Sequence, residues 1–144
     1  MTILRNSFMA FVALVSFASC TKYEGRGGKS SITGKVELTQ KLYVNGLLTG
    51  QVIGLNAAKE DVYIVYGDGD LIYDDKTECN YDGTFIFDFL QPGTYTIFAY
   101  SEVFNPGPNI ANNDDDYYTK EVVKQTVVLT KKSSSDIGTL TLIK

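Results

Sequence analysis

Carboxylates are the side chains of this sequence that could do chemistry. The 144 residues include 17 Asp and Glu but no His, which excludes a Ser-His-Asp triad, a Cys-His pair and an H-E-x-x-H zinc helix. Two cysteines are too few for a zinc site built from Cys alone. The remaining chemistry is acid–base catalysis by carboxylate pairs, or the binding of a hard cation.

Two acidic clusters have the composition of a calcium site, since Ca²⁺ binds six to eight oxygens that often come from closely spaced Asp and Asn. Asp68-Gly69-Asp70 begins like an EF-hand loop, but Ile72 and Tyr73 occupy positions that require an oxygen ligand and a glycine. Two interpretations stay open: a calcium site, or solvated acidic loops that bind no cofactor and keep the protein soluble. The candidate ligands are Asp68, Asp70, Asp74 and Asp75 in the first cluster, and Asp114, Asp115 and Asp116 in the second.

The acidic side chains are concentrated in the middle of the chain. Residues 60–116 contain 13 acidic side chains and one basic one, whereas residues 20–59 and 117–144 are both net basic. Nucleic acid is excluded as a partner, because its binding needs a basic surface. The bases near the two ends are too few and too dispersed to predict a polybasic membrane patch.

Tyrosines beside the acidic clusters indicate carbohydrate binding as an alternative function. Sugar-binding platforms combine exposed aromatic rings with Asp, Asn or Gln side chains. Tyrosine in the loops of a sandwich is also common as half-buried packing, and that interpretation stays open. The candidate contacts are Tyr73, Tyr81, Tyr117 and Tyr118.

The carboxylates do not predict an enzyme. Glycoside hydrolysis needs two carboxyl groups about 5–10 Å apart, in a concave pocket. By pattern, every carboxylate here falls in a turn, a loop or a solvent-facing strand position. We therefore predict no catalytic residues.

The chain reads as strands, because apolar and polar residues alternate and no segment keeps a helical period. Asn45-Gly46 between two apolar runs predicts a hairpin. Seven to eight short strands with frequent turns predict an all-β fold, an antiparallel two-sheet sandwich. The expected core consists of Val62, Ile64, Phe85, Phe87, Phe89, Tyr95, Ile97, Val127, Leu129, Leu140 and Leu142. The unpaired Cys79 is expected to be a small, half-buried residue, not a reactive thiol.

The N-terminus predicts export. Residues 8–17 form an apolar run that is too short to span a bilayer, which takes roughly 20 residues, but that suits a signal peptide. The run ends in Phe17-Ala18-Ser19-Cys20, which resembles the bacterial lipobox. This resemblance implies cleavage before Cys20 and a membrane anchor through a lipid on its thiol. An ordinary secretory signal is the alternative.

The chain then divides into a signal peptide over 1–19, a lipidated Cys20 with a flexible tether over 20–31, and one sandwich domain over 32–144. Thr21 stands where an Asp would retain a lipoprotein at the inner membrane of some bacteria. The implied location is the outer membrane of a bacterial cell envelope, on either its periplasmic or its surface side.

Residues 83–97 resemble the signature G-x-[FY]-x-F-x-x-L-x-P-G-x-Y-x-[IV] of carboxypeptidase regulatory-like and collagen-adhesin B-type modules. These modules are transthyretin-like, or prealbumin-like, sandwiches that serve as spacers, adhesion units and sugar-binding attachments, and they are not enzymes. Two additions to the family pattern, a hairpin over 39–57 and a polar loop over 101–118, are the expected places for partner contacts. The signature positions are Gly83, Phe85, Phe87, Leu90, Pro92, Gly93, Tyr95 and Ile97.

Two of these positions have specific structural roles. Pro92-Gly93 predicts a type II turn with a positive φ at Gly93. Tyr95 is expected to bury its ring while its hydroxyl finds a backbone partner. The function that follows is a non-enzymatic, lipid-anchored envelope module with a structural or interaction role, whose partner is an envelope protein. The alternative is a carbohydrate-binding accessory whose partner is a glycan.

The lipid anchor is directly testable. Protein extracted from membranes should lack residues 1–19, and its intact mass should include a diacylglycerol on Cys20. The Cys20→Ser variant, which cannot accept the lipid, should not be cleaved and should keep residues 1–19. An unmodified Cys20 in the native protein would contradict the anchor.

Overall fold

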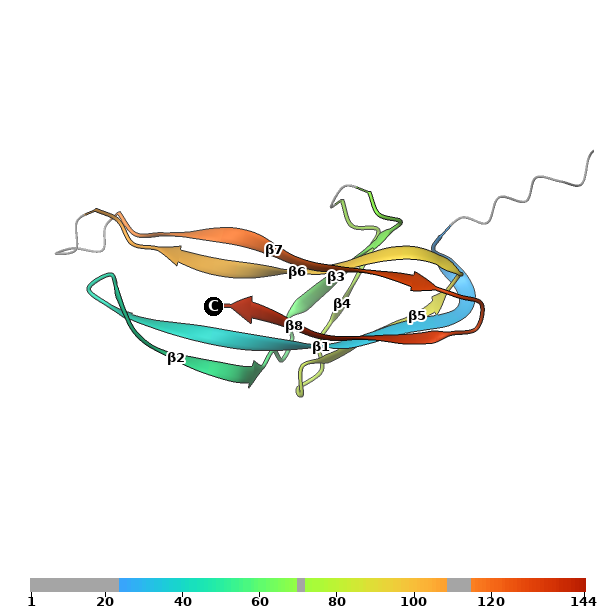
Figure 1. Ribbon diagram of the computed structural model, residues 1–144, viewed down its shortest axis with the longest axis horizontal. Coiled ribbons are helices and arrows are strands. Elements are labelled where there is room, and N and C mark those ends of the chain that lie inside the picture. Colours follow the sequence, from blue (N-terminus) through green and yellow to red (C-terminus); the bar gives the residue numbers. More distant parts are fainter. Residues whose placement is uncertain (1–23, 70–71, 109–114) are drawn as a thin grey trace, which may run out of the picture.

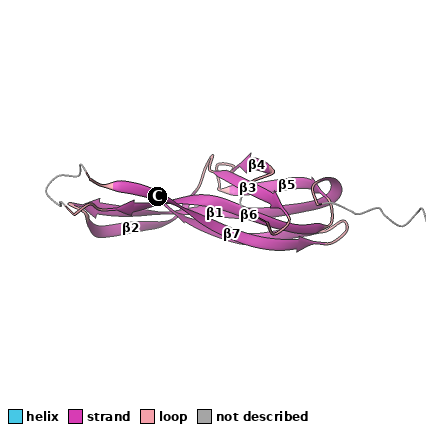
Figure 2. Cartoon of the chain, turned by 90° about the horizontal axis from the view of Figure 1, so that it is seen from above, coloured by secondary structure: helices cyan, strands magenta, loops and turns pink. Residues whose placement is uncertain are grey.

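The computed structural model describes residues 24–69, 72–108 and 115–144, which fold into two stacked sheets (Figures 1 and 2). The first sheet has the order β2-β1-β5, with β8 on the other side of β1, and the second has the order β4-β3-β6-β7. All strand pairs are antiparallel except β1–β8, which is parallel. The predicted all-β, two-sheet sandwich is confirmed. The eight strands are β1 (Arg26–Val44), β2 (Leu47–Asn56), β3 (Asp61–Tyr66), β4 (Asp75–Glu78), β5 (Thr84–Leu90), β6 (Gly93–Asn105), β7 (Tyr117–Leu129) and β8 (Ser134–Ile143).

The described residues include no helix that is long and apolar enough to cross a membrane. The predicted signal peptide and Cys20 lie outside the described residues. The predicted tether over 20–31 is too long, because β1 begins at Arg26 and is paired with β5 and β8 before residue 32.

The long strand β1 belongs to two parts of the molecule. Its first half pairs with β5 through Lys35, and its second half pairs with β2 from Glu37 onward. Along its other edge it pairs with β8, from Ser31 opposite Ser134 to Thr39 opposite Ile143. This strand therefore runs from the sandwich into the hairpin that it forms with β2.

The core lies between the two sheets and contains most of the residues expected there. Val127 is only partly buried. The prediction that Phe89 belongs to the core is wrong, because this residue is 67% exposed. The φ angle of Phe89 is 60°, and one residue in the left-handed region interrupts the strand alternation. Leu90 consequently turns inward in place of Phe89 and is buried.

The predicted type II turn is also wrong in its geometry. Gly93 has no positive φ, and the left-handed residue near this turn is Phe89. Among the glycines of the signature, Gly83 is the one with a positive φ, 83°, which favours glycine. A Cβ atom at Gly83 would lie only 2.4 Å from the carbonyl oxygen of Val36, so a side chain there would force β1 away.

The Tyr95 hydroxyl ties the start of the described chain to the β5–β6 turn. It donates to the carbonyl of Gln91 over 2.9 Å and accepts from the backbone N–H of Gly25 over 2.9 Å. The ring is fully buried, which confirms the expected buried ring with a backbone partner. Burial raises the pKa of Tyr95 above its usual value, so the hydroxyl stays protonated.

Two hairpins extend beyond the sandwich at the same end of the molecule (Figure 1). The first arm is the paired part of β1 and β2, residues 37–44 and 47–56, and its turn has φ angles of 49° at Asn45 and 70° at Gly46. Positive φ at both positions is typical of a type I′ hairpin, and the predicted hairpin is confirmed. The second arm pairs residues 101–105 of β6 with residues 117–121 of β7. The predicted loop over 101–118 is therefore too long, since both of its ends are strand.

The Tyr95 hydroxyl gives a stability prediction. Tyr95→Phe should lower the free energy of unfolding by about 1 to 3 kcal/mol, because it leaves the buried Gly25 N–H without a partner. Urea denaturation would measure the change. Tyr81→Phe is the matched control, since Tyr81 is 84% exposed and should change stability by no more than a few tenths of a kcal/mol. Equal effects of the two substitutions would contradict the role of the Tyr95 hydroxyl.

Candidate functional site

An open cleft of about 730 Å³ lies between the two arms. One wall is the end of the first arm, residues 41–46 with Thr49, and the other consists of Phe104, Asp116 and Tyr118 of the second arm. The hairpin turn at Asn45 positions the first wall, and the β6–β7 pairing positions the second. The cleft is thus built by strand and turn residues near the tips of two separate hairpins.

Three aromatic rings line the cleft. Phe104 is central, with its ring centroid 4.4 Å from that of Tyr43 on the opposite arm and 5.4 Å from that of Tyr118 on the neighbouring strand. Tyr118 is 65% exposed, so much of its surface is open to a ligand. Phe104 and Tyr118 are directly paired across β6 and β7, which explains why their rings meet.

Polar groups surround these rings. The Asp116 carboxylate accepts a hydrogen bond from the backbone N–H of Gly107 over 2.8 Å, and the Thr49 hydroxyl donates to the carbonyl of Leu42 over 3.0 Å. Lys41 and Asn45 complete the polar edge. Hydrogen-bonding groups of both charges therefore border an aromatic surface.

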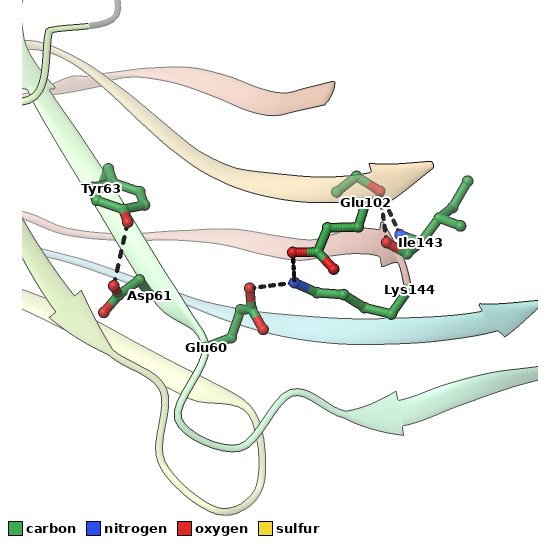
Figure 3. A network of polar contacts seen from close by, with 7 residues as sticks. Glu60, Asp61, Tyr63, Glu102, Ile143 and Lys144 are labelled. Carbon is green, nitrogen blue, oxygen red and sulfur yellow. Dashed lines mark hydrogen bonds and ion pairs between the residues drawn. The ribbon is translucent and has the colours of Figure 1, made fainter. Parts of the chain in front are cut away.

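A network of ionic and hydrogen bonds supports the base of the arms. Lys144 Nζ lies 2.9 Å from a carboxylate oxygen of Glu60 and 3.8 Å from one of Glu102 (Figure 3). The Ser101 hydroxyl donates to the carbonyl of Ile143 and accepts from its backbone N–H. These contacts tie β8 to β6 where the second arm begins.

Only one of the four candidate tyrosines lines this cleft. Tyr118 does, whereas its neighbour Tyr117 is not among the lining residues. Tyr73 packs against Tyr63 with ring centroids 4.8 Å apart, and Tyr81 projects from the turn between β4 and β5. The four tyrosines therefore do not form one platform.

Acidic side chains of the first cluster form hydrogen bonds within the protein, and the two clusters lie apart. The Asp74 carboxylate accepts from the backbone N–H of Tyr66 over 2.7 Å, and Asp75 accepts from Arg26 Nε over 2.7 Å. Asp68 is exposed in the turn after β3. Asp70 and Asp114 lie outside the described residues, and Asp115 and Asp116 follow Asp114 at the tip of the second arm.

The turn after β3 and the tip of the second arm lie in different parts of the molecule (Figure 1). Within the described ranges, no group of three or more acidic, Cys or His side chains is placed to hold a metal ion. Calcium binding stays a prediction.

Cys79 has the environment of a structural residue. It is buried in the core cluster, and burial, together with the nearby carboxylates of Glu60, Asp61 and Asp82, raises its pKa from 9.0 to about 11. A thiol with that pKa is almost entirely protonated at neutral pH and is a poor nucleophile. Cys79 is thus more deeply buried than the half-buried position expected from the sequence, and its lack of reactivity stays a prediction.

Two of the three cleft aromatics were not predicted from the sequence. Phe104 fell in a segment that was expected to be loop, and Tyr43 meets it only because two distant hairpins lie together. Phe104 lies opposite Tyr118 in the β6–β7 hairpin, so predicting that hairpin from the sequence would have placed Phe104 beside Tyr118. A second aromatic group was also missed, in which Tyr63 and Tyr100 pack against the fully buried Phe98.

Comparison with known proteins identifies the fold. No protein-family model matches the chain, and no curated protein matches it. A solved structure from Pseudomonas aeruginosa, described as a "putative carbohydrate binding protein", is similar with a TM-score of 0.51 and 14% sequence identity, covering 81% of this chain and 90% of that chain. At that identity the likeness shows the fold alone: this chain is a β-sandwich of the same kind.

Proposed function

We propose that this protein is a non-enzymatic carbohydrate-binding module, anchored to a bacterial cell envelope through a lipid on Cys20. The saccharide occupies the cleft between the arms. The observation that carries the proposal is the convergence of Tyr43, Phe104 and Tyr118 from both arms on one open, polar-edged cleft.

The chemistry of the cleft fits a sugar. A saccharide ring has an apolar C–H face, which packs on an aromatic ring, and a rim of hydroxyls, which exchange hydrogen bonds with polar groups. Tyr118 and Phe104 offer the aromatic surface, and Asn45, Asp116 and Lys41 offer donors and acceptors. The volume of about 730 Å³ lies within the range of small-molecule sites.

The distribution of carboxylates favours binding over hydrolysis. Glycosidases use two carboxyl groups on either side of the scissile bond. Among the described residues that line the cleft, Asp116 is the carboxylate. Glu102 is not among the residues that line the cleft; it lines two other pockets, and its carboxylate lies 3.8 Å from Lys144 Nζ.

The Pseudomonas aeruginosa structure supports the same ligand class through its description as a carbohydrate-binding protein. The placement of the arms supports a role in display. The described chain starts at the end of the sandwich opposite the arms (Figure 1), so an anchor on Cys20 would point the cleft away from the membrane. The resemblance to carboxypeptidase regulatory-like modules, which include sugar-binding attachments, agrees with this function.

Glycan binding tests the proposal. The native protein should bind a subset of an immobilised glycan array, and Tyr118→Ala should reduce the affinity for those glycans by roughly fivefold to a hundredfold, because about 1–3 kcal/mol of stacking is lost. Tyr81→Ala is the matched control, since Tyr81 is also exposed, to 84% against 65% for Tyr118, but lies outside the cleft. A blank array, or an equal loss in both variants, would refute the cleft as a sugar site.

A second candidate function is protein interaction, and strand β2 favours it. β2 is an edge strand of ten residues that contains no charged side chain. Its apolar side chains Leu47, Leu48, Val52, Ile53 and Leu55 are between 38% and 68% exposed. The edge strands of the other sheet differ, since β4 is short and charged, and β7 carries Lys120, Glu121 and Lys124.

Charges and short length protect sheet edges from pairing with other chains, and β2 lacks both. We assign its outer edge to β2 of a second copy of this chain. The β2 strands of two copies carry no charge, so they can pair antiparallel without electrostatic repulsion. A two-fold contact of this kind is self-complementary.

The oligomeric state tests this interaction. Light scattering after size exclusion should find a dimer, and Ile53→Lys should convert it to a monomer, because lysines at a paired edge oppose strand addition. Val128→Lys is the control, since Val128 is similarly exposed on the charged strand β7 and should leave the dimer intact. A native monomer at high concentration would overturn the role of β2.

A further inference from the structure

Three lysines from distant parts of the sequence lie together at the end of the sandwich opposite the arms. Lys29 from β1 lines one pocket with Lys131 and Lys132 from the β7–β8 turn, and Gly28, Gln91 and Pro92 complete it. The pocket has a volume of about 290 Å³. The bases near the two ends of the chain are dispersed in the sequence, but three of them are brought together by the fold.

Buried hydrogen bonds hold these lysines in place. Ser30, which is 2% exposed, donates from its hydroxyl to the carbonyl of Thr130 over 2.9 Å and accepts from the backbone N–H of Ser133 over 3.2 Å. The backbone N–H of Ser31 donates to the carbonyl of Ser133 over 3.0 Å. The two residues between Thr130 and Ser133 are Lys131 and Lys132, so the turn that carries them is fastened beside Lys29.

The backbone of this turn is unusual for a lysine. Lys132 has a φ of 58°, in the left-handed region that Gly and Asn adopt more readily. Close packing of the chain also shapes the pocket, because a Cβ atom at Gly28 would collide with the carbonyl of Leu90. These backbone contacts thus fix the position of the pocket, and the side chains of its three lysines are exposed.

The charge of the pocket is not neutralised from within the described chain. The ion pairs among the described residues involve the cations Arg26, Lys35, Lys76 and Lys144. None of them includes Lys29, Lys131 or Lys132. No acidic side chain lines the pocket, and Glu24 packs instead against Gly93. Three like charges held together without a partner favour an external anion.

We propose that this pocket binds a phosphate group, supplied by the headgroup of an anionic membrane lipid. Lysine is a strong ligand for phosphate as a compact point charge. The lipid source rests on the tether in the proposed function, because the chain from Cys20 to Arg26 can span only about 20 Å when fully extended. A lipid on Cys20 therefore keeps this end of the sandwich near the bilayer, where each lysine at the surface strengthens binding roughly fivefold.

Vesicle binding tests the lipid source, with the full chain carrying Cys20→Ser so that no covalent lipid contributes. Sedimentation with vesicles of neutral phosphatidylcholine, or of phosphatidylcholine mixed with anionic phosphatidylglycerol, isolates the part of binding that depends on negative charge. The triple variant Lys29→Gln/Lys131→Gln/Lys132→Gln should lose roughly a hundredfold of that part. The control Lys59→Gln/Lys120→Gln/Lys124→Gln removes the same charge from exposed positions outside the pocket and should lose far less.

A second arm distinguishes lipid phosphate from free phosphate. Millimolar inorganic phosphate that raises Tm for the native protein but not for the pocket variant, without any lysine-dependent vesicle binding, would keep the phosphate site and overturn its lipid source. Equal behaviour of the pocket and control variants in both arms would overturn the proposal. Glycan binding by the pocket variant and the intact mass of native protein are read separately, so a failed cleft or a failed anchor is not mistaken for a failed pocket.

Discussion

The continuous pairing of β1 is the constraint on which the rest of the molecule depends. This strand of 19 residues forms hydrogen-bonded ladders with β5, β2 and β8. Its buried side chains, Ile32 and Val36 among them, belong to the core, and its distal half carries Tyr43 into the cleft. The core and the proposed binding site are therefore parts of one sheet, and the position of the first arm is set by the packing of the sandwich.

The second arm is anchored in the core in the same way as the first. β6 contributes Tyr95, Ile97 and Ala99 to the core and then continues to Phe104 at the cleft. The Ser101 hydroxyl fastens β6 to the end of β8 just before the arm begins. Each cleft wall is thus the extension of a strand that is anchored in the core, which suits a site that must keep aromatic rings at fixed separations.

The fold class was predictable because alternation and turn residues are local properties of the sequence. The hairpin at Asn45-Gly46 and the buried Tyr95 follow from local chemistry and are observed. Phe89 was not predictable in the same way, since its positive φ depends on how the chain leaves β5. The strand ends at residues 101–105 were obscured by the polar composition of the neighbouring loop, and their pairing with β7 outweighs it.

The candidate sites, too, were predictable only where local sequence identifies the residues. Tyr118 could be singled out because it follows a run of Asn and Asp, but Tyr43, which lines the same cleft, lies 75 positions earlier and is brought there only by tertiary packing. The lysine pocket likewise unites residues about a hundred positions apart, and the link is a buried serine that carries no signal of its own. Composition finds side chains of the right type, whereas the topology decides which of them share a surface.

The parallel β1–β8 pair also has a consequence for how the chain folds. It joins Ser31 to Ser134 and Thr39 to Ile143, so this part of the first sheet cannot form until β8, about a hundred residues after its partner in β1, has been synthesised. Contacts of such long sequence separation slow folding, because the entropy of closing a large loop is lost before the contacts form. A chain built this way remains unfolded for longer as it leaves the ribosome, which is the state that a secretion channel for unfolded polypeptides accepts.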